Sequence, residues 1–256
     1  MITRSPSPLQ RGQTHEAPLG IPPSWQAQLA GVIRDPRELC HRLGLDASWL
    51  PGAEVGHDLF EVRVPEAFLS RIRPGDPEDP LLRQVLPSGI EAETTPGFVA
   101  DPLAEAESTA APGLIHKYPG RVLLIASPSC AVNCRYCFRR HFPYDENAPS
   151  RAQWDRTLAH LHDDPSIREA ILSGGDPLAA SDRQLAWLVQ RLEAIPHLKR
   201  LRIHTRLPVV IPDRIDTALL HWLSATRLQK VVVLHINHAN EIDEAVVNAC
   251  RKLRDA

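Results

Sequence analysis

The stretch RVLLIASPSCAVNCRYC, residues 121–137, decides the fold of this chain. It begins with a mostly apolar run of strand length and continues into a loop that carries three cysteines. Similar apolar runs occupy residues 169–173, 201–205 and 231–237, and a helical pattern follows each of them. Near-continuous apolar strands that alternate with helices predict a parallel sheet covered by helices, in a barrel or a doubly wound arrangement.

Start signals mark the predicted helices. Ser150 and Ser181 each stand three residues before a glutamine, which is the pattern of a capping box. Asp213 and Asn240 are candidate N-caps of the third and fourth helices. Because ligands of parallel sheets gather at the carboxyl ends of the strands, we expect any chemistry to lie just after each strand. The segments at these places are SPSCAVNCRYC, SGGDP, HTRLP and HINHAN.

Composition and charge define the class of protein. Of the 256 residues, 43% are hydrophobic and 23% are charged, which is typical of a globular protein. The 29 basic and 31 acidic residues give a formal net charge of -2, so we expect neither nucleic acid nor a membrane as a partner. Without a long apolar stretch or a signal peptide, we expect a cytoplasmic protein with reduced cysteines. Cys40 and Cys250 are predicted to be buried as small hydrophobic residues.

Three segments are predicted along the chain. Residues 1–23 are rich in Ser, Pro, Gln and Gly and are expected to be disordered. Residues 24–115 combine short helices with a proline-rich wrapping segment, and residues 116–256 carry the alternating strands and helices. The short helical patterns lie at residues 25–32, 36–43 and 65–72.

Cys130-x3-Cys134-x2-Cys137 places three thiolates on one short loop, which could hold zinc or an iron–sulfur cluster. Structural zinc takes four ligands, commonly from paired C-x2-C motifs, and the chain has no second pair. Nearby histidines could complete a zinc site, so a zinc-stabilised structural or binding protein is one alternative. Three cysteines on a cubane cluster leave one iron open to a small chelating ligand, which favours a catalytic cluster.

This motif resembles that of the radical S-adenosylmethionine superfamily, in which an aromatic residue, here Tyr136, precedes the last cysteine. Ser173, Gly174, Gly175 and Asp176 are similar to the glycine-rich segment of that superfamily, which contacts the amino group of S-adenosylmethionine. The segments HKYPGRVLL, CAVNCRYCFRRHFPY, SGGDPL, IPHLKRLRIHTRLPVVIP and HINHANEID narrow the resemblance to the lysine 2,3-aminomutase family. The segments DPRELCHRLGLD, VPEAFLSRI and DPLLRQVLP are most similar to the branch that makes β-lysine for elongation factor P.

The resemblance implies a partial (β/α)6 barrel of the TIM type with an N-terminal helical extension, of which about four βα units are present here. It implies an isomerase that moves the amino group of L-lysine from Cα to Cβ. Its cofactors would be a 4Fe–4S cluster, S-adenosylmethionine and pyridoxal 5′-phosphate. A flavodoxin or ferredoxin would supply the electron, and a separate ligase would attach β-lysine to elongation factor P. Free lysine or glutamate as a metabolic substrate is the alternative within the family.

The resemblance also implies roles for individual residues. Cys130, Cys134 and Cys137 would bind three irons, and Tyr136 would lie along the adenine. Arg139, the first of a pair with Arg140, would contact the lysine carboxylate, and a solvated basic turn is the alternative. The segment 173–176 would face the methionyl amino group. The residues that would face pyridoxal phosphate are Lys117, Tyr118 and Arg121. The strand-end residues that could contact the adenosyl group or the substrate, or merely cap loops, are His204, Thr205, Arg206, His235, Asn237 and His238.

The pyridoxal lysine of this family lies beyond the fourth strand and helix, so no Schiff-base lysine is expected in this chain. Lys199 and Lys230 precede strands, and Lys252 lies on the last helix. We therefore expect a C-terminally truncated form that lacks competent aminomutase activity and exposes an open sheet edge.

Overall fold

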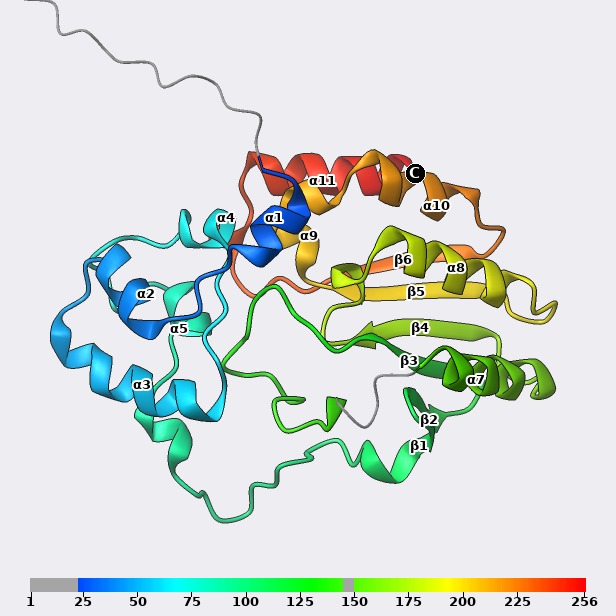
Figure 1. Ribbon diagram of the computed structural model, residues 1–256, viewed down its shortest axis with the longest axis horizontal. Coiled ribbons are helices and arrows are strands. Elements are labelled where there is room, and N and C mark those ends of the chain that lie inside the picture. Colours follow the sequence, from blue (N-terminus) through cyan, green and yellow to red (C-terminus); the bar gives the residue numbers. More distant parts are fainter. Residues whose placement is uncertain (1–22, 145–149) are drawn as a thin grey trace, which may run out of the picture.

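Six strands form one sheet in the computed structural model, which describes residues 23–144 and 150–256 (Figure 1). The strands are β1 (Thr109–Ala111), β2 (Leu114–Tyr118), β3 (Arg121–Ser127), β4 (Glu169–Gly174), β5 (Arg200–Thr205) and β6 (Gln229–Leu234). They lie in sequential order, antiparallel from β1 to β3 and parallel from β3 to β6. Within the described residues the sheet is not closed, which confirms the α/β class and the partial TIM-like barrel.

The four predicted parallel strands lie where the apolar runs are, with ends that differ by up to three residues. The antiparallel hairpin of β1 and β2 is an addition that the sequence pattern does not show. The prediction of disorder over residues 1–23 falls outside the described residues, apart from Pro23. The predicted boundary at residue 116 stays a prediction, and β2 crosses it.

Helices cover one face of the parallel strands, and their caps correct two predictions (Figure 1). They are α7 (Arg151–Asp163), α8 (Asp182–Glu193), α10 (Thr217–Ala225) and α11 (Glu244–Asp255). Ser150 forms the full capping box with Gln153. Ser181 forms only half of the box: its hydroxyl accepts from the Gln184 N–H at 3.3 Å, while the Gln184 side chain donates to the Ala126 carbonyl. Asp216 and Asp243 cap α10 and α11, not Asp213 and Asn240. Asp213 and Asn240 lie inside separate 3-10 turns, Pro212–Arg214 and Ala239–Glu241, and α10 and α11 begin after these turns.

Short helices make up the N-terminal segment. They are α1 (Trp25–Ala30), α2 (Pro36–Arg42), α3 (Leu50–Leu59), α4 (Glu66–Leu69) and α5 (Leu82–Val85), and α9 (Leu207–Val210) follows β5. The first, second and fourth confirm the predicted helical patterns with shorter bounds, whereas α3 and α5 were not predicted. Further 3-10 turns span Ala47–Trp49, Gly89–Ala92, Ala106–Ser108 and Pro177–Ala179.

One continuous hydrophobic core joins the N-terminal segment to the sheet. Phe68 and Leu82 belong to the same buried cluster as Leu124 and Leu172. Cys40 is buried as predicted, but Cys250 is only partly buried, because it lies on the side of α11 that the described residues leave partly uncovered. In the described part of the chain, no helix has the length and apolar character needed to span a membrane.

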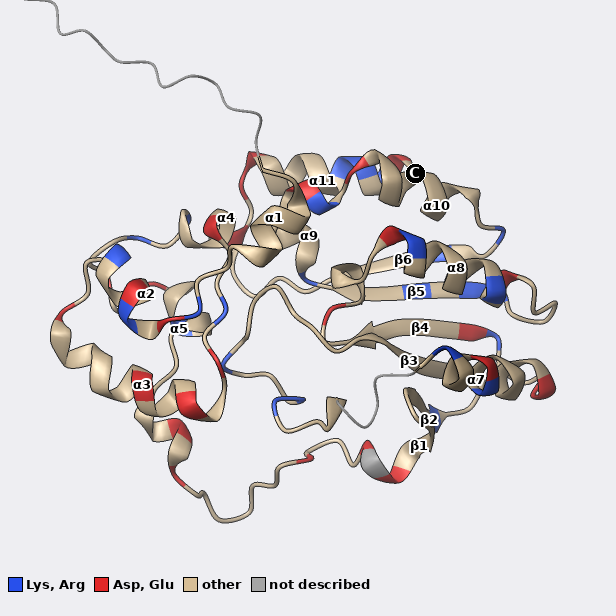
Figure 2. Ribbon diagram, viewed as in Figure 1, with Lys and Arg blue, Asp and Glu red and all other residues tan. Residues whose placement is uncertain are grey.

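Charged residues meet on neighbouring strands of the sheet. Figure 2 shows acidic colour at the start of β4 beside basic colour on β5. Glu169 pairs with Arg202 at 2.5 Å and with Arg200 at 3.6 Å. On β5 the less buried residues Arg200, Arg202 and His204 alternate with buried ones, so these three side chains share one face of the sheet. Of these three residues, His204 lies nearest the carboxyl end of β5.

Candidate active site

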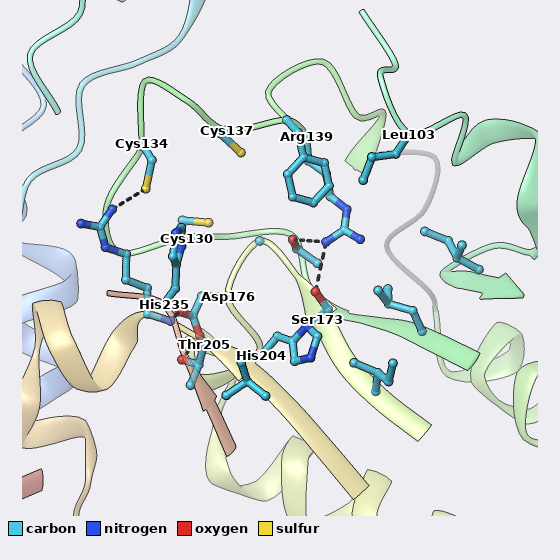
Figure 3. Close-up of a pocket in the computed structure, with 18 of the residues that line it drawn as sticks. Leu103, Cys130, Cys134, Cys137, Arg139, Ser173, Asp176, His204, Thr205 and His235 are labelled. Atoms are coloured by element: carbon cyan, nitrogen blue, oxygen red, sulfur yellow. Dashed lines mark hydrogen bonds between the residues drawn. The ribbon is translucent and has the colours of Figure 1, made fainter. Parts of the chain in front are cut away.

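A cavity of about 620 Å³ lies at the carboxyl ends of β3 to β6 (Figure 3). The residues that the sequence predicted to bind the cluster, S-adenosylmethionine, the substrate or pyridoxal phosphate line this cavity, and so do Thr205, Arg206 and His235. The predicted binding residues are Lys117, Tyr118, Arg121, Cys130, Cys134, Tyr136, Cys137, Arg139, Ser173, Gly174, Gly175, Asp176 and His204. Asn237 and His238 do not line it; Asn237 donates to the Tyr136 hydroxyl from behind. The cavity thus lies at the carboxyl ends of the strands, where parallel sheets usually bind ligands.

The cysteine loop is held by the N-terminal segment. The backbone N–H of Arg135 donates to the Gln84 carbonyl at 2.9 Å, and the N–H of Asn133 donates to the Arg63 carbonyl at 3.1 Å. Inside the loop, the N–H of Cys137 donates to the Cys134 carbonyl at 2.9 Å. The N-terminal helices thus act as a support for the loop, which explains why they share its core.

The three thiols have the chemistry of a cluster site. Burial, with a smaller contribution from Asp176, raises the pKa of Cys130 well above its ordinary value, and burial also raises the pKa of Cys137. These thiols are therefore protonated until a metal displaces the protons. Among the described residues no three ligating side chains are close enough to hold one metal ion. Three cysteines of a 4Fe–4S cluster each bind a different iron, so their spread around the cavity fits a cluster better than a single ion.

Gly174 and Gly175 let the end of β4 approach the loop that leads to Cys130. Gly174 has a φ of +118°, and a Cβ there would lie 2.5 Å from the Ser127 carbonyl oxygen. A Cβ on Gly175 would lie 2.7 Å from the carbonyl oxygen of Ser129. The N–H groups of Gly175 and Asp176 donate to those two carbonyls at 2.9 and 2.8 Å. The two glycines are thus required by backbone packing, whatever ligand they also contact.

Asp176 ties β4 to the end of β5. Its buried carboxylate accepts hydrogen bonds from the Thr205 hydroxyl at 2.7 Å and from the N–H groups of Arg206, Leu207 and Leu178 at 2.7, 2.9 and 3.0 Å. Burial raises the pKa of Asp176, and these four bonds oppose that shift. All four bonds are made within the chain, so the side chain positions the β5 end; a contact with a methionyl amino group stays a prediction.

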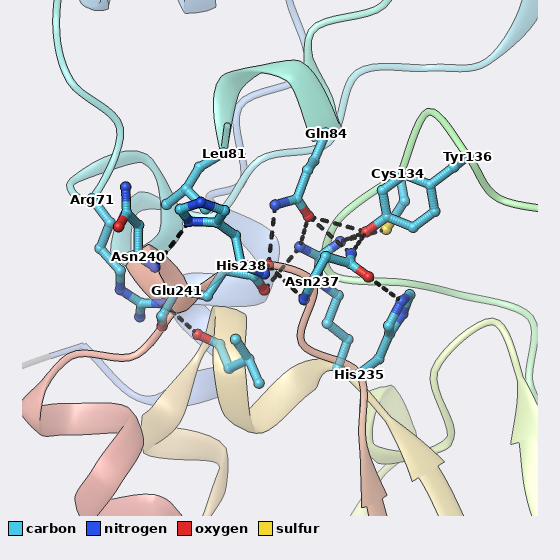
Figure 4. Close-up of polar contacts among 12 residues, drawn as sticks. Arg71, Leu81, Gln84, Cys134, Tyr136, His235, Asn237, His238, Asn240 and Glu241 are labelled. Carbon is cyan, nitrogen blue, oxygen red and sulfur yellow. Dashed lines mark hydrogen bonds and ion pairs between the residues drawn. The ribbon is translucent and has the colours of Figure 1, made fainter. Parts of the chain in front are cut away.

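Arg206 is the centre of a buried polar network beside Cys134 (Figure 4). Its Nη1 donates to the Cys134 Sγ at 2.8 Å and to the Tyr136 hydroxyl at 2.6 Å. Its Nη2 donates to Gln84 at 2.6 Å and pairs with Glu241 at 3.1 Å. Burial opposes ionisation of Glu241, but Arg206 and the hydrogen bonds from Asn237 and Gln84 hold its pKa below the usual value. Gln84 and Glu241 were not predicted, because they lie 122 and 35 positions from Arg206 along the chain.

Arg139 is buried and paired, which excludes a solvated basic turn. Its Nε and Nη2 donate to the two carboxylate oxygens of Glu105 at 2.7 and 2.6 Å. Its Nη1 donates to the Ser173 hydroxyl at 3.0 Å. Arg140 points elsewhere and pairs with Glu91 at 2.9 Å. Glu105 was not foreseen, because its segment shows only a run of small and acidic residues.

The side of the cavity nearest β2 carries Lys117, Tyr118 and Arg121, the residues predicted to face pyridoxal phosphate. Lys117 donates from Nζ to the Leu103 carbonyl, and Tyr118 is 58% exposed, so its ring is open to a planar ligand. Across the cavity, burial and the charges of Arg202 and Arg139 lower the pKa of His204. The imidazole is therefore neutral at pH 7.

Comparisons with known proteins agree with this site. The sequence profile of the radical SAM superfamily matches residues 124–255. The chain is 52% identical over 231 residues to the L-lysine 2,3-aminomutase of Escherichia coli (strain K12), which covers 90% of this chain and 67% of that protein. Identity to the L-lysine 2,3-aminomutase of Haemophilus influenzae is 49% over 230 residues, or 90% of this chain and 68% of the relative. For the L-lysine 2,3-aminomutase of Clostridium subterminale it is 34% over 235 residues, or 91% and 56%.

The chain thus spans about two thirds of the length of the E. coli relative. The superfamily implies a 4Fe–4S cluster and S-adenosylmethionine, which the three cysteines and the adjoining cavity suit. The profile match covers the cysteine loop and the carboxyl ends of β4 to β6 but not Lys117, Tyr118 or Arg121. The chain therefore belongs to the radical SAM superfamily and, within it, to the L-lysine 2,3-aminomutase family of isomerases.

Proposed function

We propose that this chain forms the cluster- and substrate-binding part of a pyridoxal phosphate-dependent lysine 2,3-aminomutase that makes β-lysine for the modification of elongation factor P. One observation carries the proposal: a single cavity joins the three cysteines, Arg139 and the Lys117–Arg121 side. The reaction requires these three binding functions to be close together, because the migrating amino group must meet the radical source.

The cysteine loop would hold the cluster and leave one iron free for S-adenosylmethionine. When bound, the cluster and S-adenosylmethionine supply a one-electron route to hydrogen abstraction, and pyridoxal phosphate carries the amino group during its migration. Cys130 and Cys137 are partly buried, which would limit the access of water and oxidants to the iron. A flavodoxin or ferredoxin is the proposed electron donor.

Arg139 would bind the carboxylate of L-lysine. Its planar guanidinium can make two parallel hydrogen bonds to a carboxylate. It is almost completely buried, so water competes little for such a bond, and it lies two residues after Cys137, which keeps a bound amino acid near the cluster. Lys117 and Arg121 would hold the phosphate of pyridoxal phosphate, and Tyr118 would contact its ring.

The elongation factor P link rests on the resemblance of the N-terminal segments, among them α2 and the stretch 79–87 around α5. The structure gives these segments a role in support, because Gln84 on α5 holds both the cysteine loop and Arg206. We infer free L-lysine as the substrate, with a separate ligase acting on the product.

Cluster and substrate can be tested separately on the anaerobically reconstituted protein. The wild type should bind about four irons and no zinc, with an EPR signal that S-adenosylmethionine alters. Cys134→Ser should lose that signal. Arg139→Gln should raise the lysine concentration needed for binding while the EPR spectrum stays unchanged. Arg140→Gln is the matched control, because Arg140 does not line the cavity.

Zinc in place of iron would refute the proposal, and so would loss of the cluster in Arg139→Gln. The elongation factor P step has its own readout: β-lysine supplied together with the ligase should increase the mass of elongation factor P by one lysyl group. Absence of that shift, with β-lysine present, would refute that step alone.

A further inference from the structure

The ion pair between Arg139 and Glu105 has a defined geometry. Glu105 occupies the edge of the guanidinium formed by Nε and Nη2, at 2.7 and 2.6 Å, and both side chains are 8% exposed. A guanidinium has five N–H donors and a second edge, formed by Nη1 and Nη2, that can also hold a carboxylate. Glu105 leaves this second edge free of its own carboxylate, and Nη1 on that edge donates to the Ser173 hydroxyl at 3.0 Å and to the Gly174 carbonyl at 3.4 Å.

The second edge lies beside a group of the cavity wall. Arg139 donates from Nη1 to the Ser173 hydroxyl at 3.0 Å, and Ser173 lies at the end of β4 (Figure 3). Both residues line the main cavity. The guanidinium is therefore held on two sides, by Glu105 at Nε and Nη2 and by the Ser173 hydroxyl and the Gly174 carbonyl at Nη1.

Space behind Arg139 makes this fixation necessary. A second cavity of about 430 Å³ is also lined by Arg139 and Glu105, together with Phe142 and His141. The ion pair thus forms part of the wall between two cavities. Packing alone does not keep the guanidinium on the side of the cysteines, because a long arginine side chain has room on the other side.

The backbone around Glu105 is arranged to present its carboxylate. Ala104 has a φ of +49°, the left-handed conformation that costs a non-glycine residue energy. The Glu105 N–H donates to the Asp101 carboxylate at 3.2 Å, and the Glu105 carbonyl accepts from the Thr109 hydroxyl at 3.0 Å. A strained residue beside a buried charge, held by its surroundings, is typical of a functional turn.

We propose that Glu105 is a positioning residue that orients Arg139 so that its Nη1 and Nη2 edge faces the carboxylate of the substrate. The inference rests on the proposed role of Arg139 and adds Glu105 to it. Glu105 neutralises the buried guanidinium without occupying the edge that the substrate needs. The class of ligand is an α-amino acid, whose planar carboxylate matches that edge in the bidentate mode.

The test compares L-lysine with 1,5-diaminopentane, which lacks only the carboxylate. Binding of each to the reconstituted full chain is measured by isothermal titration calorimetry. Glu105→Gln should weaken L-lysine binding by about tenfold or more, because the amide cannot accept both hydrogen bonds. Its effect on 1,5-diaminopentane should stay within about twofold. In an Arg139→Gln background, Glu105→Gln should have no further effect on L-lysine. Glu107→Gln, two residues away and exposed, is the matched control.

A second variant covers the case in which Glu105→Gln does not fold. Glu105→Asp keeps the charge but shortens its reach, and it should weaken L-lysine selectively by a smaller factor. Equal losses for both ligands would overturn the inference. Tighter binding of L-lysine in either variant would also overturn it, because Glu105 would then compete with the substrate carboxylate for Arg139. If instead Arg139→Gln leaves L-lysine binding unchanged, the proposed role of Arg139 fails first, so the two failures are distinguishable.

Discussion

Gly174→Ala adds a methyl group where the structure leaves no room for one. The new Cβ would lie 2.5 Å from the Ser127 carbonyl oxygen and 3.1 Å from the Ile125 side chain. The residue would also have to keep a φ of +118°. The backbone conformation costs about 1–3 kcal/mol, and overpacking against a rigid strand costs a further ~1–3 kcal/mol. The expected loss of about 2–6 kcal/mol is a large part of the ~5–15 kcal/mol that stabilises a typical domain.

Two other glycines separate these contributions. Gly44→Ala keeps a positive φ, +60°, but meets nothing within 4 Å, so it should cost about 1–2 kcal/mol from the backbone alone. Gly175→Ala has no positive φ but brings its Cβ to 2.7 and 2.8 Å from the carbonyl oxygens of Ser129 and Pro128. It should cost about 1–3 kcal/mol from crowding alone.

The assay is urea unfolding of the metal-free, reduced protein at 25 °C, followed by circular dichroism. Gly174→Ala should lose the most free energy of unfolding, close to the sum of the other two. Gly175→Ala should also bind less iron than Gly44→Ala, because its crowded carbonyls lead directly into Cys130. A Gly174→Ala protein that is no less stable than Gly44→Ala would refute the close-approach reasoning.

Three further predictions concern other buried polar groups. Asp176→Asn should lower the free energy of unfolding in urea by about 2–4 kcal/mol, because the new amide nitrogen would face N–H and O–H groups that now donate to the carboxylate. An unchanged urea midpoint would contradict this expectation. The pKa of His204 is lowered in the folded state, so the unfolded chain binds the proton more readily, and stability rises with pH between about 5 and 7. The free energy of unfolding of the wild type should therefore fall more steeply with falling pH than that of His204→Gln. The charged groups near position 204, which are Arg202, Arg139 and Glu169, are the same in both proteins, so the difference reports the imidazole alone. Parallel pH profiles would disprove this expectation. Arg214→Met removes a fully buried partner of Asp182 and should cost about 3–5 kcal/mol by thermal unfolding, whereas Arg191→Met, in an exposed pair, should cost ~1 kcal/mol or less; equal losses would count against the burial argument.

Local patterns in the sequence predicted much of the fold. The strands β3 and β4 could be placed because a strand buried on both faces is mostly apolar, as in residues 121–127 and 169–174. Ser150 could be placed because a capping box is made within four residues. The hairpin of β1 and β2 could not, because β1 is the short stretch Thr109–Ala111 without an alternating pattern.

Some residues of the candidate site could be predicted from the sequence, and others could not. The sequence predicted the cysteine loop from its local spacing, and the family resemblance of its motifs added the glycine pair and Arg139. Because parallel strand ends meet at one edge, these motifs were expected to lie together. Only the tertiary structure decided that Glu105 pairs with Arg139, and that Gln84 and Glu241 meet Arg206. These contacts join residues that are 34, 122 and 35 positions apart. A buried charge must find a partner, but which partner it finds depends on how distant segments pack, and no local pattern encodes that.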